Sequence, residues 1–352
     1  MRLGIVIHGP EVIDTGRAEH LLRFLGEMGY CEVCLGGAMG AAAVIDAGLE
    51  NIIDISRREK VSEAMVRLDR TCDVIVVLNH AKTKESGVAF GSIIVKRLPG
   101  ELEHPAIQLD VGFILPLNRK GEDMARDISS KLKMELEGVA CDQFCQSHRI
   151  IHGVIPGENV WINGNVIGRA LTDKVTIRID DGLPIFEGVE VKEQGLKKVL
   201  PFSLNDSMIR TGRVRRTKVV PRSMDRESNG RIMLIDHCAE DSFFETEDAS
   251  LAVTVGDDTT RIAGALLYRK GMSIIGITDG DEDGICGEDV FASGSVIIKL
   301  HPGNDDILGN EVRERFFGDD VHARLNGTAA ELVEMIIEMG GDRIKEILWI
   351  GS

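Results

Sequence analysis

Two clusters of glycine and aspartate follow two apolar stretches in the last third of the chain. Gly256-Asp257-Asp258-Thr259-Thr260 comes after LAVTV, and Asp279-Gly280-Asp281-Glu282-Asp283 comes after SIIGIT. Both stretches are rich in β-branched residues, as strands buried on both faces are. A helix between them completes a right-handed βαβ unit with parallel strands. Both clusters are therefore expected at the same edge of a sheet, where open α/β folds bind ligands.

These residue types suit a divalent cation and a phosphate. Carboxylates are the hard oxygen ligands that Mg²⁺ or Mn²⁺ prefers, and a helix N-terminus binds phosphate. The predicted metal ligands are Asp257, Asp279, Asp281 and Asp283. The predicted phosphate-binding residues of this region are Gly256, Thr259 and Thr260, with Asp258 as a candidate catalytic group. The alternative is that these are ordinary turn residues and that Asp258 or Thr259 only caps the helix.

Two further strand ends carry polar residues. LIDHCAED (234–241) contains His237, a candidate base or ligand for which a structural role is the alternative. KLHPGNDD (299–306) brings Asp305 and Asp306 to another strand end.

A basic segment stands out in this acidic chain. RTGRVRRTKVVPR (210–222) supplies Arg213, Arg215 and Arg216, whose guanidinium groups are suited to phosphate recognition. The alternative is that they neutralise acidic surface or a seam between domains.

The N-terminal third offers a second set of loops at strand ends. HGPEVIDTG (8–16) predicts an anion site at His8 and Gly9, with LGGAMG (35–40) and NHAKTKESG (79–87) at the same edge. LGGAMG lacks the glycine spacing of the dinucleotide fingerprint, and plain tight packing is the alternative.

Composition excludes several classes of protein. The 352 residues carry 41 Lys and Arg against 57 Asp and Glu, a net charge of −16, which argues against general nucleic-acid binding and against attachment to an anionic membrane. No apolar run reaches the length of a membrane helix, and the first residues read as a strand. Seven cysteines favour reduced thiols over a disulfide framework, and Cys31 and Cys34 would face opposite sides of a strand rather than share zinc. We therefore expect a cytoplasmic protein, and an oligomer is compatible with the sequence.

The order of elements predicts the fold class: α/β, with two Rossmann-like, doubly wound domains joined by a small β-rich module. The expected parts are an N-terminal flavodoxin-like domain (1–140), the β-rich module with the basic segment (149–229) and a C-terminal domain with the acidic loops (230–352). Within the first part, Asp14 is expected to cap a helix, and NIIDIS (51–56) is expected to form a strand.

Several stretches together resemble one archaeal family. They are VIHGPEVIDTG, AVIDAGLENIIDIS, NGNVIGRA, IRTGRVRRT, IDHCAED and VTVGDDTT. The family consists of conserved proteins found chiefly in methanogens and carries a domain of unknown function. The resemblance implies an archaeal origin and no particular activity. The layout around GDDTT and ITDGD is also similar to phosphofructokinase-type and NAD-kinase-type sites, but the paired glycines before the aspartate are missing.

The first functional hypothesis is a metal-dependent enzyme, a phosphotransferase or phosphohydrolase, acting on a phosphorylated or nucleotide-like small molecule. The second is a non-catalytic metabolite-binding sensor. The third is an assembly factor whose acidic surface docks a partner protein.

Overall fold

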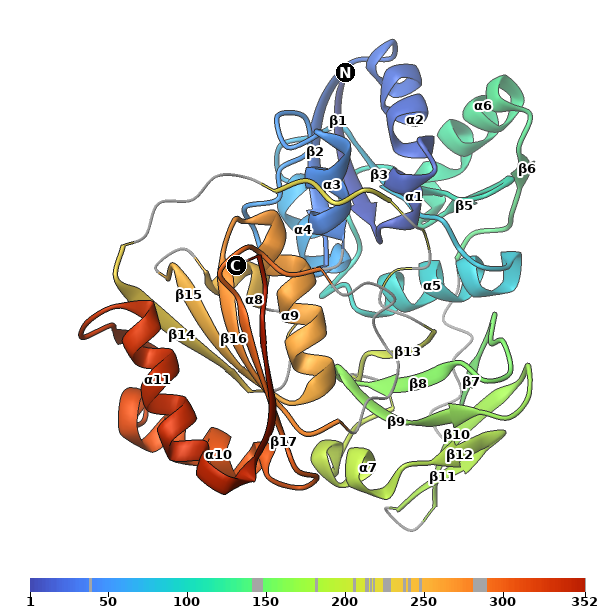
Figure 1. Cartoon of the computed structure of the whole chain (residues 1–352). Helices are drawn as coiled ribbons and strands as arrows, with labels where there is room; N and C mark the ends of the chain where they lie inside the picture. Colours follow the sequence, from blue (N-terminus) through green and yellow to red (C-terminus); the bar gives the residue numbers. More distant parts are fainter. Residues whose placement is uncertain are drawn as a thin grey trace. The chain divides into compact units, whose positions relative to one another are not determined.

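Residues 1–219 and 220–352 form two compact units in the computed structural model. The structure describes residues 1–37, 40–140, 148–180, 183–204, 207–212, 215, 217, 219–223, 229–236, 239, 242–246, 249–280 and 290–351. Each unit has its own sheets and core (Figure 1). The β-rich module belongs to the first unit, and the division into three parts stays a prediction. Among the described residues, none of the helices combines the length and apolar character that crossing a bilayer requires.

The first unit begins with a mixed sheet in the order β2-β1-β3-β4-β5-β6. Its first four strands are parallel, and β5 runs antiparallel to β4. The strands are β1 (Arg2–His8), β2 (Tyr30–Gly36), β3 (Val74–Leu78), β4 (Ala106–Leu109), β5 (Phe113–Pro116) and β6 (Glu135–Leu136). The helices are α1 (Glu11–Asp14), α2 (Arg17–Gly26), α3 (Gly40–Ala47), α4 (Val61–Leu68), α5 (Lys84–Lys96), η1 (Arg119–Gly121) and α6 (Glu122–Leu132).

One face of this sheet packs on α4 and α5. Val6, Ile75 and Val77 of the strands join Met65 of α4 and Ile94 of α5 in one buried cluster. Because side chains alternate along a strand, Ile5 and Ile7 point to the opposite face, where they are fully buried. The sheet is therefore covered on both faces, as its apolar parallel strands require.

The module that follows consists of two small antiparallel sheets, β11-β10-β7 and β12-β9-β8-β13. Its elements are β7 (His148–Ile151), β8 (Asn159–Ile162), β9 (Asn165–Ala170), β10 (Val175–Asp180), β11 (Leu183–Glu187), β12 (Val189–Val191), α7 (Glu193–Val199) and β13 (Ile209–Thr211). The hairpin predicted at INGN joins β8 to β9, with Asn163 and Gly164 at positive φ. Val160, Ile167 and Ile177 lie in its separate core.

The second unit has a six-stranded sheet in the order β18-β14-β15-β16-β17-β19, in which the four central strands are parallel. The strands are β14 (Arg231–Asp236), β15 (Leu251–Val255), β16 (Ser273–Thr278), β17 (Val296–Leu300), β18 (His322–Arg324) and β19 (Ile344–Trp349). The helices are α8 (Ser242–Glu245), α9 (Asp257–Arg269), α10 (Asp305–Val312), the π-helical turn η3 (Arg313–Phe317), α11 (Ala329–Gly340) and η4 (Gly341–Arg343).

Helices cover both faces of this second sheet (Figure 1). Val253 and Ile275 pack with Leu308 of α10 and Ile336 of α11 on one face. On the other face α9 comes so close to β16 that a Cβ added at Gly276 would lie 2.4 Å from Thr260 Cγ2. The mixed α/β fold class predicted from the sequence is confirmed.

Two details of the prediction were wrong. Residues 51–56 form no strand, and only an isolated bridge joins Asp54 to Cys34 of β2. Asp14 does not cap a helix, because α2 begins after Gly16, which takes the left-handed conformation. The sequence analysis also missed β5, β6 and β18, which are only two to four residues long.

Candidate metal centre

The turn from β15 into α9 places Asp257 at the sheet edge. Gly256 has φ 95° and ψ 148°, a conformation that is essentially restricted to glycine. Its N–H donates to the carbonyl of Ile277 in the neighbouring strand, and its carbonyl accepts from Thr260 N–H to begin the helix. Asp257 is thus the first helical residue, and the residue is only 9% exposed.

Hydrogen bonds tie together the ends of three parallel strands. Asp257 Oδ2 accepts from the backbone N–H of Asp279, at 3.0 Å, and of Gly280, at 2.9 Å, just after β16. Asp279 Oδ2 in turn accepts from Gly303 N–H, after β17. The loops that follow β15, β16 and β17 are therefore fixed to one another through two carboxylates.

Three carboxylates converge at this edge. Asp257, Asp279 and Asp305 each place an oxygen within 4.8 Å of the other two. Asp279 Oδ1 is buried and has no hydrogen-bond partner among the described residues. Like charges at such a distance repel by on the order of 1 kcal/mol per pair even at the dielectric constant of water, and a cation would offset that cost. The donor set of carboxylate oxygens suits Mg²⁺ or Mn²⁺.

The other residues predicted for this region lie differently. Thr260 is 1% exposed, and its hydroxyl pairs with Thr254 of β15 at 2.8 Å, so it supports the packing of α9. Thr259 and Asp258 are half-buried in the first turn of the helix. Asp281, Asp283 and His237 fall outside the described residues, and their predicted roles stay predictions.

Arg215 is the one predicted arginine that the structure describes; Arg213 and Arg216 lie outside the described residues. Its guanidinium binds Asp14 of α1 through Nε and Nη2, and Asp46 of α3 through Nη1 at 2.6 Å. Burial alone would lower the pKa of Arg215, yet the two carboxylates raise it above its ordinary value. In the first unit Arg215 thus has a structural role, and phosphate binding by this residue stays a prediction.

His8 and Gly9 lie at the carboxyl end of β1. His8 Nδ1 is 3.0 Å from Asn79 Oδ1, and Asn79 Nδ2 donates to Asp110 Oδ2 at 2.7 Å. Asp110 is fully buried and follows β4. The residues thus belong to the ends of three neighbouring strands of the first sheet.

Sequence reasoning missed three members of these two groups. Asp305 was noticed near a strand end but was not assigned as a ligand, while Asn79 and Asp110 received no role. The signal was present, because each of them comes within a few residues after a buried apolar strand. What the sequence lacked was the strand order that brings the strand ends together.

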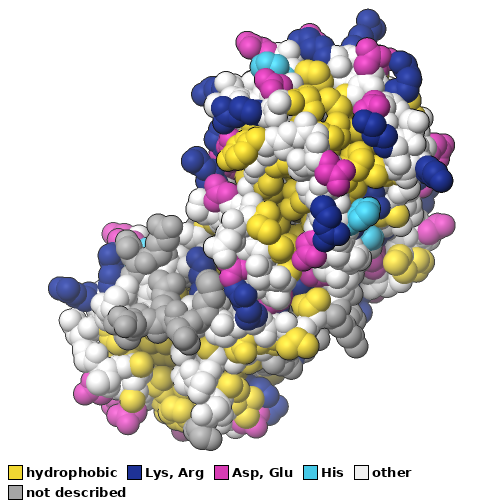
Figure 2. Space-filling view, turned by 90° about the horizontal axis from the view of Figure 1, so that it is seen from above, with side chains coloured by type: hydrophobic (Ala, Val, Ile, Leu, Met, Phe, Trp, Pro, Cys, Tyr) yellow, Lys and Arg dark blue, Asp and Glu magenta, His cyan; other side chains and the backbone are white. Residues whose placement is uncertain are grey.

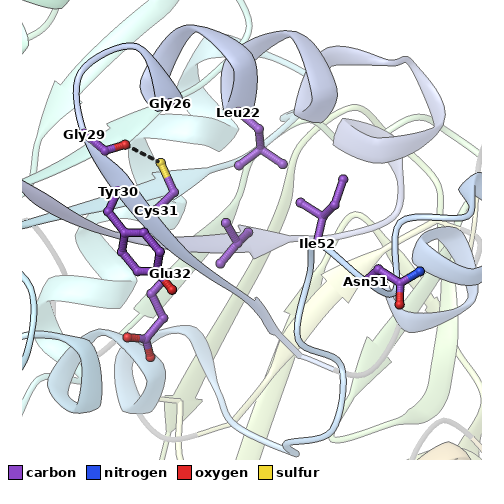
Figure 3. A pocket seen from close by; sticks show the side chains of 9 residues that line it. Leu22, Gly26, Gly29, Tyr30, Cys31, Glu32, Asn51 and Ile52 are labelled. Carbon is purple, nitrogen blue, oxygen red and sulfur yellow. Dashed lines mark hydrogen bonds between the residues drawn. The ribbon is translucent and has the colours of Figure 1, made fainter.

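A surface hollow of about 570 Å³ lies beside edge strand β2 of the first unit, and its lining does not include His8, Asn79 or Asp110 (Figure 3). Its lining includes Leu22, Tyr30, Glu32 and Ile52, and Cys31 Sγ contacts the carbonyl of Gly29 there. Cys34 is buried on the other face of the strand, where desolvation raises the pKa of its thiol to about 11. Cys31 and Cys34 thus face opposite sides of the strand, as the sequence predicted.

Comparison with known proteins identifies the family. The chain is 35% identical over 328 residues to "Uncharacterized protein MJ0065" of Methanocaldococcus jannaschii, covering 88% of this chain and 90% of that relative. No solved structure matches. Residues 5–320 match the family described as "Uncharacterized protein conserved in archaea (DUF2117)". The resemblance seen in the sequence is therefore confirmed, and the chain belongs to this archaeal family.

Proposed function

We propose that the second unit binds a divalent cation, Mg²⁺ or Mn²⁺, between Asp257, Asp279 and Asp305 and acts on a phosphorylated or nucleotide-like small molecule. The observation that carries this proposal is the convergence of the three carboxylates within 4.8 Å at the carboxyl edge of a parallel sheet. The buried, unpartnered Oδ1 of Asp279 supports it, because a metal ion would supply the missing partner.

The fixed position of the first two ligands favours metal binding over a solvated turn. Asp257 Oδ2 is held by two backbone N–H groups, so its second oxygen is oriented before any cation arrives. Neither Asp257 nor Asp279 pairs with a lysine or arginine among the described residues. The thirteen-residue helix α9 adds its positive N-terminal end, which suits a phosphate bound beside the metal.

The proposed reaction class is phosphoryl transfer or phosphate hydrolysis. The cation would neutralise charge on the phosphate oxygens. Asp258, half-buried one residue beyond Asp257, is the nearest described candidate for orienting a hydroxyl or water.

A sensor that binds the same ligand without converting it is the second candidate. The first hypothesis predicts that a bound phosphate ester is consumed, and the sensor predicts that it is not. For an assembly factor, the described residues on the face shown in Figure 2 offer no continuous acidic patch, because acidic and basic side chains are interspersed on it.

Binding of Mn²⁺, followed by electron paramagnetic resonance, tests the site. We expect Asp279→Asn to weaken Mn²⁺ binding by about 100-fold, since changing even the residues that orient metal ligands costs about 10- to 100-fold. The matched control is Asp306→Asn, which removes an exposed carboxylate next to Asp305 and is expected to leave binding unchanged. Equal binding by wild type and Asp279→Asn would refute the metal centre.

The substrate class is tested by melting the protein with nucleotides and sugar phosphates, each with and without Mn²⁺. A ligand at 100 times its Kd adds about 2.7 kcal/mol of stability. Phosphorus NMR of the stabilising compound then separates an enzyme, which changes its spectrum, from a sensor, which does not.

A further inference from the structure

The first sheet has a topological switch point at His8. From β1 the chain passes to β2 on one side, and it later crosses to β3 and β4 on the other. His8 is the last residue of β1, and Asn79 directly follows β3. In open α/β sheets the crevice at such a reversal is where ligands bind.

The hydrogen-bond network fixes the tautomer of His8. Asp110 is acceptor-only when ionised, and it is held by Ala81 N–H, Val111 N–H and Gln108 Nε2. Asn79 must therefore turn its amide Nδ2 towards Asp110 and its Oδ1 towards His8. The proton of the neutral imidazole then sits on Nδ1, and Nε2 keeps its lone pair.

The ring of His8 is held by stacking, while its Nε2 is left without a hydrogen bond by the described residues. His8 stacks on Phe90 of α5, with ring centroids 4.1 Å apart and 23° between the planes. The residue is half-buried, and no hydrogen bond to Nε2 comes from any described residue. This is an oriented imidazole whose acceptor atom takes no hydrogen bond from the part of the chain that the structure describes.

Burial favours the neutral ring of His8. Burial lowers its pKa, which the hydrogen bond that His8 donates to Asn79 and the carboxylates of Glu11 and Asp110 partly oppose, while Arg210 lowers it further. A neutral acceptor does not attract phosphate by charge. A group that donates, such as a hydroxyl or an amine, is the chemical match for Nε2.

From this geometry we infer that His8 is the hydrogen-bond acceptor of a second small-molecule site, whose ligand presents a hydroxyl or amine group to Nε2. No covalent bond changes when the ligand binds: its O–H or N–H donates to the lone pair of Nε2, and Asn79 Oδ1 keeps the imidazole proton on Nδ1. Asn79 is the positioning residue, and Asp110 orients Asn79. This inference differs from the phosphate role predicted for His8, and it is independent of the metal centre.

Nitrogen-15 NMR of the histidine-labelled full chain tests the tautomer. We expect the His8 signals, assigned by their loss in His8→Gln, to show Nδ1 protonated and Nε2 unprotonated at pH 7. Asn79→Ala should give a mixture of tautomers, because nothing then fixes Nδ1. A fully protonated ring, or an Nε2–H tautomer in wild type, would overturn the assignment.

Access to Nε2 is tested with diethyl pyrocarbonate, which acylates unprotonated imidazole nitrogen, followed by mass spectrometry of the folded protein. We expect His8 to react, and to keep its rate at pH 6, where an ordinary histidine is partly protonated. His104, whose Nδ1 is held by Asp69, is the internal comparison. Failure of His8 to react before unfolding would make it a purely structural histidine. Protection of His8 by inorganic phosphate would overturn the donor class of ligand, and no protection would support it.

Discussion

Two carboxylate clusters in this protein differ in whether a described lysine or arginine pairs with them. In the first unit Asp14 and Asp46, whose side chains are 2% and 3% exposed, share the guanidinium of Arg215. In the second unit Asp257 and Asp279 are held by backbone N–H groups, and no described lysine or arginine pairs with either. The first cluster is neutralised by the chain itself. In the proposed metal centre the countercharge would come from a bound cation, so we expect the source of the countercharge, rather than the number of acids, to distinguish the structural cluster from the site.

Removing the internal countercharge should give the largest effect. Arg215→Met leaves two buried carboxylates without their cation, and breaking a buried ion pair costs about 3–5 kcal/mol. We expect urea unfolding to show a loss of that size, with no dependence on added Mn²⁺.

The matched control is Arg126→Met, which breaks an ion pair with Asp123 on the exposed face of α6. Surface pairs contribute less than about 1 kcal/mol, so its stability should barely change. If Arg215→Met were as mild as Arg126→Met, the two clusters would not differ in the way described, and Arg215 would be available for ligand binding.

Removing one carboxylate from the second cluster should stabilise the protein when no metal is present, whereas Arg215→Met destabilises it. In EDTA, Asp279→Asn relieves repulsion with Asp257 and with Asp305, and the free energy of unfolding should rise by about 2 kcal/mol. With saturating Mn²⁺ the order should invert, because only wild type gains binding energy. Thermal unfolding of wild type and Asp279→Asn in EDTA and in Mn²⁺ measures which protein is the more stable in each buffer. A loss of stability in EDTA would mean that the carboxylate serves mainly as an acceptor for Gly303 N–H.

The contrast also shows how far the sequence could lead. Apolar β-branched runs and glycine breaks predicted the alternation of strands and helices, and they placed Asp257 and Asp279 at one edge. The pairing of Arg215 with Asp14 was not predictable, because about 200 residues separate them and each has a plausible local role. Asp305 was missed for the same reason. The sequence shows that a loop is polar, but only the order of the strands in the sheet shows which loops lie next to one another.

The predicted strand at 51–56 failed for a related cause. Its β-branched residues Ile52, Ile53 and Ile55 favour an extended chain, but Ile52 is 56% exposed and only Asp54 reaches β2. Local propensity therefore did not determine pairing at the sheet edge.

The smallest effect concerns a single neutral group, His8. Burial, only partly opposed by the Asn79 hydrogen bond and by Glu11 and Asp110, puts the folded-state pKa below the ordinary value of 6.5. Below about pH 6.5 the unfolded chain therefore binds more protons at this position than the folded protein does. The stability contributed by neutral His8 is present above that pH and is lost as the pH falls through the folded-state pKa.

We therefore expect the free energy of unfolding, measured with urea, to fall less between pH 7.5 and pH 5.5 in His8→Gln than in wild type. His301→Gln, which changes an exposed histidine after β17, should keep the wild-type drop. If His8→Gln lost as much stability as wild type between the two pH values, the imidazole would be as easily protonated in the folded protein as in the unfolded chain. The comparison would then change, because a protonated His8 would supply positive charge to the first sheet edge, and an anion would become the better ligand there as well.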